Sequence, residues 1–281
     1  MIRIKKSISL HYTHTGKKFF HGEDEDYLKI KANIFAVFDG VTLLFQDPYP
    51  LPSPARMAAK QGVNAFIDYV QRHKNKKDKL ALIRDAFEEG NKTIKRLNIK
   101  LGLTPGTVDY LSKQYAATVG AAGLIEKDMF YFGQVNDCGV IVMDCFGKRK
   151  VDLVADDTAF REYTSYLGRL GRYNGAVERH KYVRRSVVNN YNLEYEGKKV
   201  NFGVMTGEVR AMQFLRVGAI QLEKGDALVC YSDGFLPHLR DEEFVEKLRG
   251  GNKGQMERKI SALEKAGAEY QKEKSLITVY V

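Results

Sequence analysis

The order of apolar patterns along the chain predicts an α+β fold in which helices pack outside stacked antiparallel β-sheets. Strand-like segments open the chain, a pair of helical patterns follows, more strands come next, and helices and a last strand end it. Short polar turns join successive strand-like segments, and such turns are typical of antiparallel hairpins. Because no repeat, low-complexity tract or Pro/Gly/Ser-rich linker interrupts the 281 residues, we expect a single domain over 1–281.

The first part of the chain predicts strands and a pair of long helices. Runs rich in apolar and β-branched residues place the strands at 2–10, 27–32 and 34–38. Ser53 followed by Pro54 is typical of a helix start, and Asp78 supplies the cap of a second helix. That second helix carries an apolar stripe at helical spacing, and Gly102 and Pro105 end it.

The remainder of the chain returns to strands and then to helices. Apolar runs predict strands at 118–125, 129–135, 140–145, 151–154, 227–232 and 276–281, with a further element at 204–211. Polar turns at 126–128 and 146–148 predict hairpins. Helices are expected at 241–248 and 256–266. The segment 157–200 is the least regular, so we expect a helix from Asp157 and then an excursion on the rim of the sheets, in the position of a flap.

Composition and charge exclude several classes of protein. Hydrophobic residues make up 44% of the chain, yet no apolar run approaches the roughly 20 residues of a membrane helix, and no signal peptide is evident, so we expect a cytoplasmic protein without a membrane partner. Sparse cysteines without CxxC spacing predict buried free thiols. The net charge of +10 comes from scattered basic clusters, which favours solvated faces. A nucleic-acid-binding protein remains an alternative that depends on charge alone, and we do not expect that partner.

Two Asp-Gly dipeptides are the most informative feature of the sequence. Asp39-Gly40 and Asp233-Gly234 each end an apolar strand, where a carboxylate is left at the edge of the packing. One such dipeptide alone is ordinary turn chemistry. Together with the acidic run 24–26, the pair predicts carboxylates gathered to bind hard metal ions.

The motifs occur in an order that resembles a known family. The segments that carry the resemblance are DED at 24–26, FAVFDG at 35–40, ATVGAA at 117–122, FGQVNDC at 132–138, GDALVCYSDG at 225–234 and SLITV at 275–279. This set is similar to the metal-dependent (PPM, type 2C) serine/threonine protein phosphatases, and FGVMTGE at 202–208 resembles their bacterial branch. The resemblance spans nearly the whole chain. It implies a four-layer α-β-β-α sandwich, with two antiparallel β-sheets flanked by helices.

The resemblance also implies a reaction and its residues. Two Mn²⁺ or Mg²⁺ ions would bind at one end of the sandwich, and a metal-activated water would hydrolyse phosphoserine or phosphothreonine in a phosphorylated protein. Asp39 would bridge the ions and Asp233 would bind one of them. The resemblance assigns the remaining metal-site positions to Glu25, Asp26, Gly40 and Asp137.

Some positions depart from the family pattern. Lys272 lies where the family has a metal-binding Asp, and whether the neighbouring Glu273 substitutes for it stays open. His21 takes the place of a phosphate-binding Arg, with Lys17 and Lys18 as compensating cations. We therefore expect weaker metal binding than in a full-pattern member, with Mn²⁺ preferred.

A pseudophosphatase, which keeps the fold as a regulatory binding module, is the main alternative. The sequence at Lys272 and Glu273 favours it, because one family ligand is lost there. The retained carboxylates oppose it, since a decayed site has no reason to keep them together. Those carboxylates are Glu25, Asp26, Asp39 and Asp233.

Overall fold

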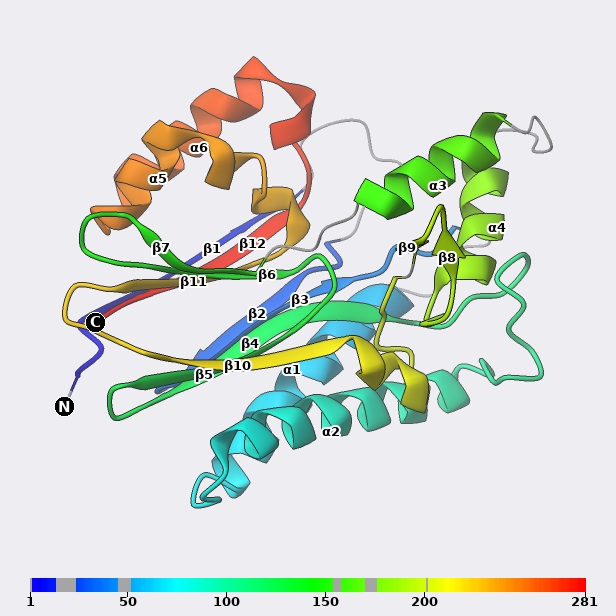
Figure 1. The fold of residues 1–281 in the computed structure, drawn as a ribbon, viewed down its shortest axis with the longest axis horizontal. Helices are drawn as coiled ribbons and strands as arrows, with labels where there is room; N and C mark the ends of the chain where they lie inside the picture. The colour runs from blue at the N-terminus through cyan, green and yellow to red at the C-terminus, as the bar shows by residue number, and fades with distance from the viewer. Residues whose placement is uncertain (1, 14–23, 45–51, 154–157, 170–175, 201) are drawn as a thin grey trace.

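A computed structural model describes residues 2–13, 24–44, 52–153, 158–169, 176–200 and 202–281 of the protein. Two antiparallel five-stranded sheets face each other, and a pair of helices covers the outer side of each (Figure 1). The predicted α+β sandwich with four layers is therefore confirmed. The layers follow from three apolar clusters, one between the sheets and one between each sheet and its helices.

The first sheet has the strand order β1-β12-β11-β6-β7. Its strands are β1 (Lys6–Tyr12), β12 (Lys274–Tyr280), β11 (Ala227–Tyr231), β6 (Gly139–Met143) and β7 (Arg149–Leu153). Helices α5 (Glu242–Arg249) and α6 (Lys253–Ala266) cover its outer face (Figure 1). The β6–β7 hairpin occurs where the polar turn at 146–148 predicts it.

The second sheet has the order β10-β5-β4-β3-β2. Its strands are β2 (Tyr27–Lys31), β3 (Ile34–Gly40), β4 (Thr118–Glu126), β5 (Met129–Val135) and β10 (Leu215–Gln221). Phe35 and Val37 of β3 enter the cluster between the sheets, whereas Ala36 and Phe38 enter the cluster beneath the helices. Because both faces of β3 are covered, its sequence is an unbroken apolar run.

Helices α1 (Pro54–Arg72) and α2 (Lys79–Lys100) cover the second sheet and begin at the predicted caps. The Ser53 hydroxyl accepts a hydrogen bond from the Arg56 amide at 3.1 Å. The Asp78 carboxylate accepts one from the Ala81 amide at 2.9 Å. These side chains satisfy amides that have no partner inside the first helical turn.

Helices α3 (Thr158–Arg169) and α4 (Ala176–Val187) and the short strands β8 (Glu194–Tyr195) and β9 (Lys198–Lys199) lie together, away from the end that holds both termini (Figure 1). The helix expected from Asp157, a residue outside the described ranges, begins at Thr158 as α3. The sequence did not predict α4 or the β8–β9 pair. We call residues 158–200 the flap segment.

Two sequence-based expectations were wrong. Residues 204–211 were expected to form one element, but a 3-10 helix covers Val209–Phe214 and the edge strand β10, which was not predicted, follows it. The cysteines are free, yet Cys145 is exposed, whereas Cys138 and Cys230 are buried. Within the described ranges, no helix is both long enough and apolar enough to span a bilayer.

Candidate functional site

Strand register brings acidic residues to one end of both sheets. In the second sheet, Gly40 at the end of β3 pairs with Thr118 at the start of β4, and Gly120 pairs with Val135 at the end of β5. In the first sheet, Tyr231 at the end of β11 pairs with Leu276 near the start of β12. The predicted site residue Asp39 lies in β3, whereas Asp26, Asp137, Asp233 and Glu273 lie beside the ends of β2, β5, β11 and β12.

Buried Asp26 and half-buried Asp39 form the centre of this acidic group. Asp26 is 2% exposed, and its Oδ2 accepts a hydrogen bond from Ser232 Oγ at 2.7 Å. Burial raises the pKa of Asp26 to about 6. Burial also raises the pKa of Asp39 well above its usual value, and the negative charges of Asp26, Asp233, Asp137 and Glu273 raise it further. Carboxylates that repel one another in this way are stabilised by a bound cation.

Glu25 is held between the loop after β3 and the start of α1. Its carboxylate accepts hydrogen bonds from the Thr42 hydroxyl and, at 3.3 Å, from Ser53 Oγ. Burial raises the pKa of Glu25 to about 7. Ser53 therefore caps α1 and also orients a predicted metal-site residue.

The glycines of both Asp-Gly dipeptides are required by close backbone contacts. A Cβ atom on Gly40 would lie 2.6 Å from the backbone of Ala55 and 2.9 Å from the Glu25 carbonyl oxygen. A Cβ atom on Gly234 would lie 1.9 Å from the Glu273 carbonyl oxygen. Only glycine fits this tight packing of strand ends, which explains the repeated dipeptide.

Glu273 and Lys272 contact different aspartates at the edge of the acidic group. Glu273 Oε1 accepts a hydrogen bond from the Asp26 amide at 2.7 Å, so the carboxylate faces that backbone. Burial and then the charge of Asp26 raise the pKa of Glu273 to about 8. The ammonium of Lys272 instead lies 3.1 Å from Asp233 Oδ2.

His11 of β1 also lies at the site. Its Nδ1 is hydrogen-bonded to Ser275 Oγ at 2.8 Å, and its Nε2 lies 3.3 Å from Asp24 Oδ2. The pairing of His11 with Ser275 across β1 and β12 places it there. No local pattern in the sequence indicates that contact.

Arg184 links the flap segment to the site. Its Nη1 donates to the Thr42 carbonyl at 2.6 Å and to Gln114 Oε1 at 2.9 Å. Burial lowers the pKa of Arg184 to about 10, while the nearby charge of Glu25 opposes that shift. The sequence predicted that this segment lies on the rim of the sheets, but not this contact.

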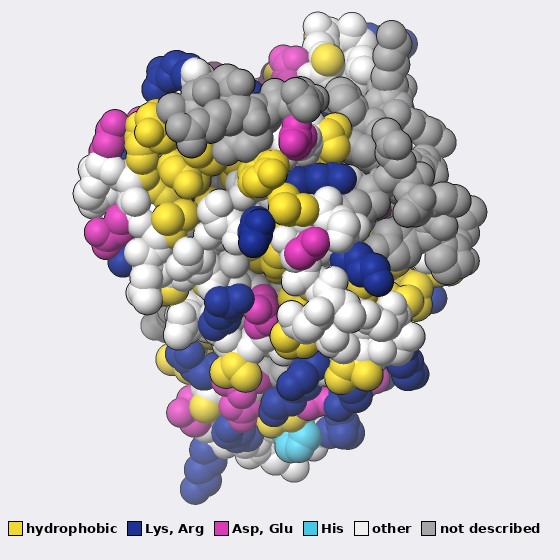
Figure 2. Space-filling model, turned by 90° about the vertical axis from the view of Figure 1, so that its right-hand side faces the viewer, with side chains coloured by type: hydrophobic (Ala, Val, Ile, Leu, Met, Phe, Trp, Pro, Cys, Tyr) yellow, Lys and Arg dark blue, Asp and Glu magenta, His cyan; other side chains and the backbone are white. Residues whose placement is uncertain are grey.

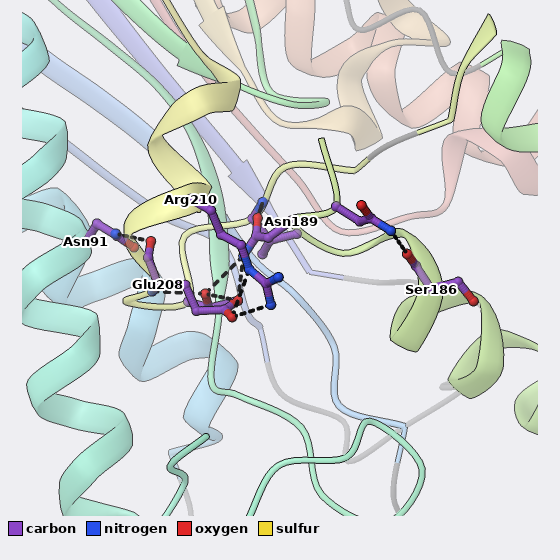
Figure 3. A network of polar contacts seen from close by, with 8 residues as sticks. Asn91, Ser186, Asn189, Glu208 and Arg210 are labelled. Atoms are coloured by element: carbon purple, nitrogen blue, oxygen red, sulfur yellow. Dashed lines mark hydrogen bonds and ion pairs between the residues drawn. The ribbon is translucent and has the colours of Figure 1, made fainter. Parts of the chain in front are cut away.

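A polar network anchors the chain that follows α4 (Figure 3). Asn189, which has a φ of 53°, donates through Nδ2 to Thr206 Oγ1 at 3.0 Å and to Glu208 Oε2 at 2.9 Å. Asn91 of α2 donates to the Glu208 carbonyl at 2.9 Å. The neighbouring Met205 bridges to Thr118, whose hydroxyl donates to the Asp39 carbonyl at 2.6 Å. The network therefore connects α2 and the flap segment to the backbone of Asp39.

The donor set of the site suits a hard divalent cation. Its candidate ligands are carboxylate oxygens and the Gly40 carbonyl, and such ions prefer oxygen ligands. The mutual repulsion at Asp39 is the second observation in favour of this fit. The predicted phosphate-binding residues His21, Lys17 and Lys18 lie outside the described residues.

Solved structures of known phosphatases share this fold. The serine/threonine phosphatase PstP/Ppp of Mycobacterium tuberculosis is 16% identical, with a TM-score of 0.65 and 98% of each chain covered. The catalytic domain of PstP in complex with two manganese ions is 17% identical, with a TM-score of 0.61 over 98% of this chain and 96% of that one. The PPM Ser-Thr phosphatase MsPP of Mycobacterium smegmatis is 13% identical, with a TM-score of 0.60 over 100% of both chains.

These similarities establish that the chain has the fold of the bacterial PPM-type phosphatases, as its motifs predict. Neither a protein-family model nor the sequence of a curated protein matches the chain.

Proposed function

We propose that the protein is a divalent-metal-dependent phosphatase that hydrolyses phosphoserine and phosphothreonine in proteins. The observation that carries the proposal is the crowding of Asp26, Asp39, Asp137 and Asp233 at one end of a PPM-type sandwich. Carboxylates that repel one another around the half-buried Asp39 weaken the fold unless a bound cation neutralises them.

The chain's own residues would hold and orient the metal centre. Asp39, Asp233 and the Gly40 carbonyl are the proposed direct ligands, with Glu25, Asp26 and Asp137 around them. Ser232 fixes Asp26, and Thr42 and Ser53 fix Glu25, so the carboxylates are oriented before substrate binds. Bound Mn²⁺ or Mg²⁺ would supply an acidified water and neutralise the phosphoryl oxygens. The two manganese ions in PstP support this choice of cofactor.

A phosphorylated protein is the proposed substrate. The flap segment lies beside the site through Arg184, which suits a surface that contacts the protein around a phosphorylated residue. On the described part of the face in Figure 2, Lys and Arg side chains are interspersed with Asp and Glu. That mixture favours a protein surface over a long polyanion as the partner. On the sequence pattern alone, we propose that it acts in the cytoplasm.

Phosphate release across a Mn²⁺ titration tests the proposal. A phosphothreonine peptide and a small aryl phosphate serve as substrates, with a phosphotyrosine peptide for comparison. We expect saturable Mn²⁺-dependent turnover of the phosphothreonine peptide. A folded sample that releases no phosphate at millimolar Mn²⁺ would refute it.

The ion pair between Lys272 and Asp233 favours a second candidate function, a pseudophosphatase that binds partners without catalysis. A cation already neutralises one of the proposed metal ligands in that arrangement. The two functions differ in turnover and not in fold. Binding of a phosphorylated peptide that the protein never hydrolyses, at any Mn²⁺ concentration, would support the second.

A further inference from the structure

Lys272 supplies a positive charge within the acidic group. Its Nζ lies 3.1 Å from Asp233 Oδ2, and the lysine side chain is 57% exposed. Asp233, Asp137 and Asp39 are the negative charges that act on this ammonium. A metal ion bound at Asp233 would therefore lie next to the Lys272 ammonium.

The backbone of Lys272 is fixed, whereas its side chain reaches into solvent. The Lys272 carbonyl accepts a hydrogen bond at 2.9 Å from Lys274 Nζ, which also lies 2.7 Å from Glu264 Oε1. Lys274 is fully buried, and the neighbouring Glu273 carbonyl packs against Gly234. The ammonium is thus tethered within reach of Asp233, which gives it a high effective concentration there.

We propose that Lys272 is a tethered competitor for the metal centre, so that a divalent ion binds Asp233 only when it displaces the ammonium. Half-exposed ion pairs are weak, so the ammonium can be displaced. The charge of a divalent ion repels it at short range, so binding at Asp233 carries a penalty that a neutral side chain would not impose. The inference rests on the proposed metal site and explains why Mn²⁺ would be needed at high concentration.

Calorimetric titration of Mn²⁺ into the substrate-free protein tests the inference without reference to activity. Lys272→Met keeps the length of the side chain and removes its charge, and Lys272→Gln is a second neutral variant. Both should tighten Mn²⁺ binding by about tenfold or more, because the competing charge is gone. Lys272→Asp should tighten it further, since a carboxylate replaces the ammonium.

Lys253→Met is the matched control. Lys253 is 55% exposed and lies 3.7 Å from Glu257, on a helix that covers the outer face of the first sheet. Its replacement should leave Mn²⁺ binding unchanged.

The outcomes separate this inference from the proposed function. Tighter Mn²⁺ binding in the neutral variants supports the inference even if no variant hydrolyses a phosphopeptide, in which case the phosphatase proposal fails alone. Equal Mn²⁺ affinity in the wild type, Lys272→Met and Lys272→Gln would overturn it, as would a lack of Mn²⁺ binding in all of them.

Discussion

His238 shows how burial sets the charge of a single residue near the site. The side chain is fully buried, and its ring lies 5.0 Å from that of Tyr270 and 5.3 Å from that of Phe235. Burial, and then the charge of Lys274, lower the pKa of His238 to about 4. The folded protein therefore keeps this imidazole neutral at pH values where an unfolded chain protonates it.

The free energy of unfolding should consequently fall as the pH decreases from 6.5 to 4, because the unfolded state binds a proton that the folded state excludes. The contribution of His238 over this range is roughly 3 kcal/mol. Urea denaturation of the metal-free wild type and of His238→Leu measures this contribution. The difference in unfolding free energy between the two proteins should depend on pH. The exposed His73, replaced by Leu, serves as control, and a constant difference between the wild type and His238→Leu would contradict the assignment.

Gly234 tests whether close packing at the strand ends is required. Gly234→Ala places a methyl group against the Glu273 carbonyl oxygen, so we expect a loss of roughly 3 kcal/mol or more in unfolding free energy. Gly106→Ala, where a Cβ meets nothing within 4 Å, should change it by less than roughly 0.5 kcal/mol. Similar thermal stabilities of the two variants would show that the turn after β11 accommodates a methyl group without much loss of stability.

For single residues, the sequence predicted the positions that follow from local patterns. Asp39 and Asp233 end apolar strands, so their place at a sheet edge could be predicted. The contact between Lys272 and Asp233 and that between His11 and Ser275 join distant parts of the chain. Such contacts depend on strand register, which one sequence does not fix.

Helix α4 is the element of the flap segment that contacts the proposed metal centre. Arg184 makes this connection through the Thr42 carbonyl and Gln114. Arg184→Lys keeps the charge but shortens the side chain and removes the guanidinium, so the two hydrogen bonds from Nη1 are weakened.

We expect Arg184→Lys to cost roughly 1–3 kcal/mol locally and to speed amide hydrogen exchange in 176–187. The exposed neighbour Arg185, replaced by Lys, is the matched control. Unchanged exchange in Arg184→Lys would mean that other contacts hold α4 in place.

The elements differed in how well the sequence predicted them. Helices α1 and α2 have capping side chains and apolar stripes, which are local signals. Strand β10 is an edge strand, and its run LRVGAIQ is interrupted by Gly218 and is only partly buried. Helix α4 has the run AVERHKYVRRSV, which is too polar for a clear stripe. Both were missed because tertiary contacts stabilise them more than their own pattern does.

For the whole molecule, a bound divalent ion should offset the repulsion among the carboxylates. Mn²⁺ at about 100 times its dissociation constant adds roughly 2.7 kcal/mol to the unfolding free energy. The melting temperature should then rise by roughly 5 °C. Differential scanning calorimetry with and without Mn²⁺ measures this shift.

At one fixed Mn²⁺ concentration, the shift in melting temperature should be larger at pH 8 than at pH 6. Glu25 and Glu273, with pKa values raised to about 7 and about 8, hold protons at pH 6 that a cation must displace. An equal shift at both pH values would contradict their place beside the proposed metal centre.

The layered architecture could be predicted because the order of motifs and the alternation of strands with helix pairs agree with one arrangement of sheets and helices. The site was harder to predict, since its outer residues arrive from β1, α4 and the start of β12.

The most direct test compares the wild type with Asp39→Asn. The quantity measured is the initial rate of phosphate release from a phosphothreonine peptide at saturating Mn²⁺. Asp39 lies at the centre of the carboxylates, so its amide variant should lose Mn²⁺-dependent turnover and still fold. Equal rates for the two proteins would contradict the assignment of Asp39 and, with it, of the metal centre.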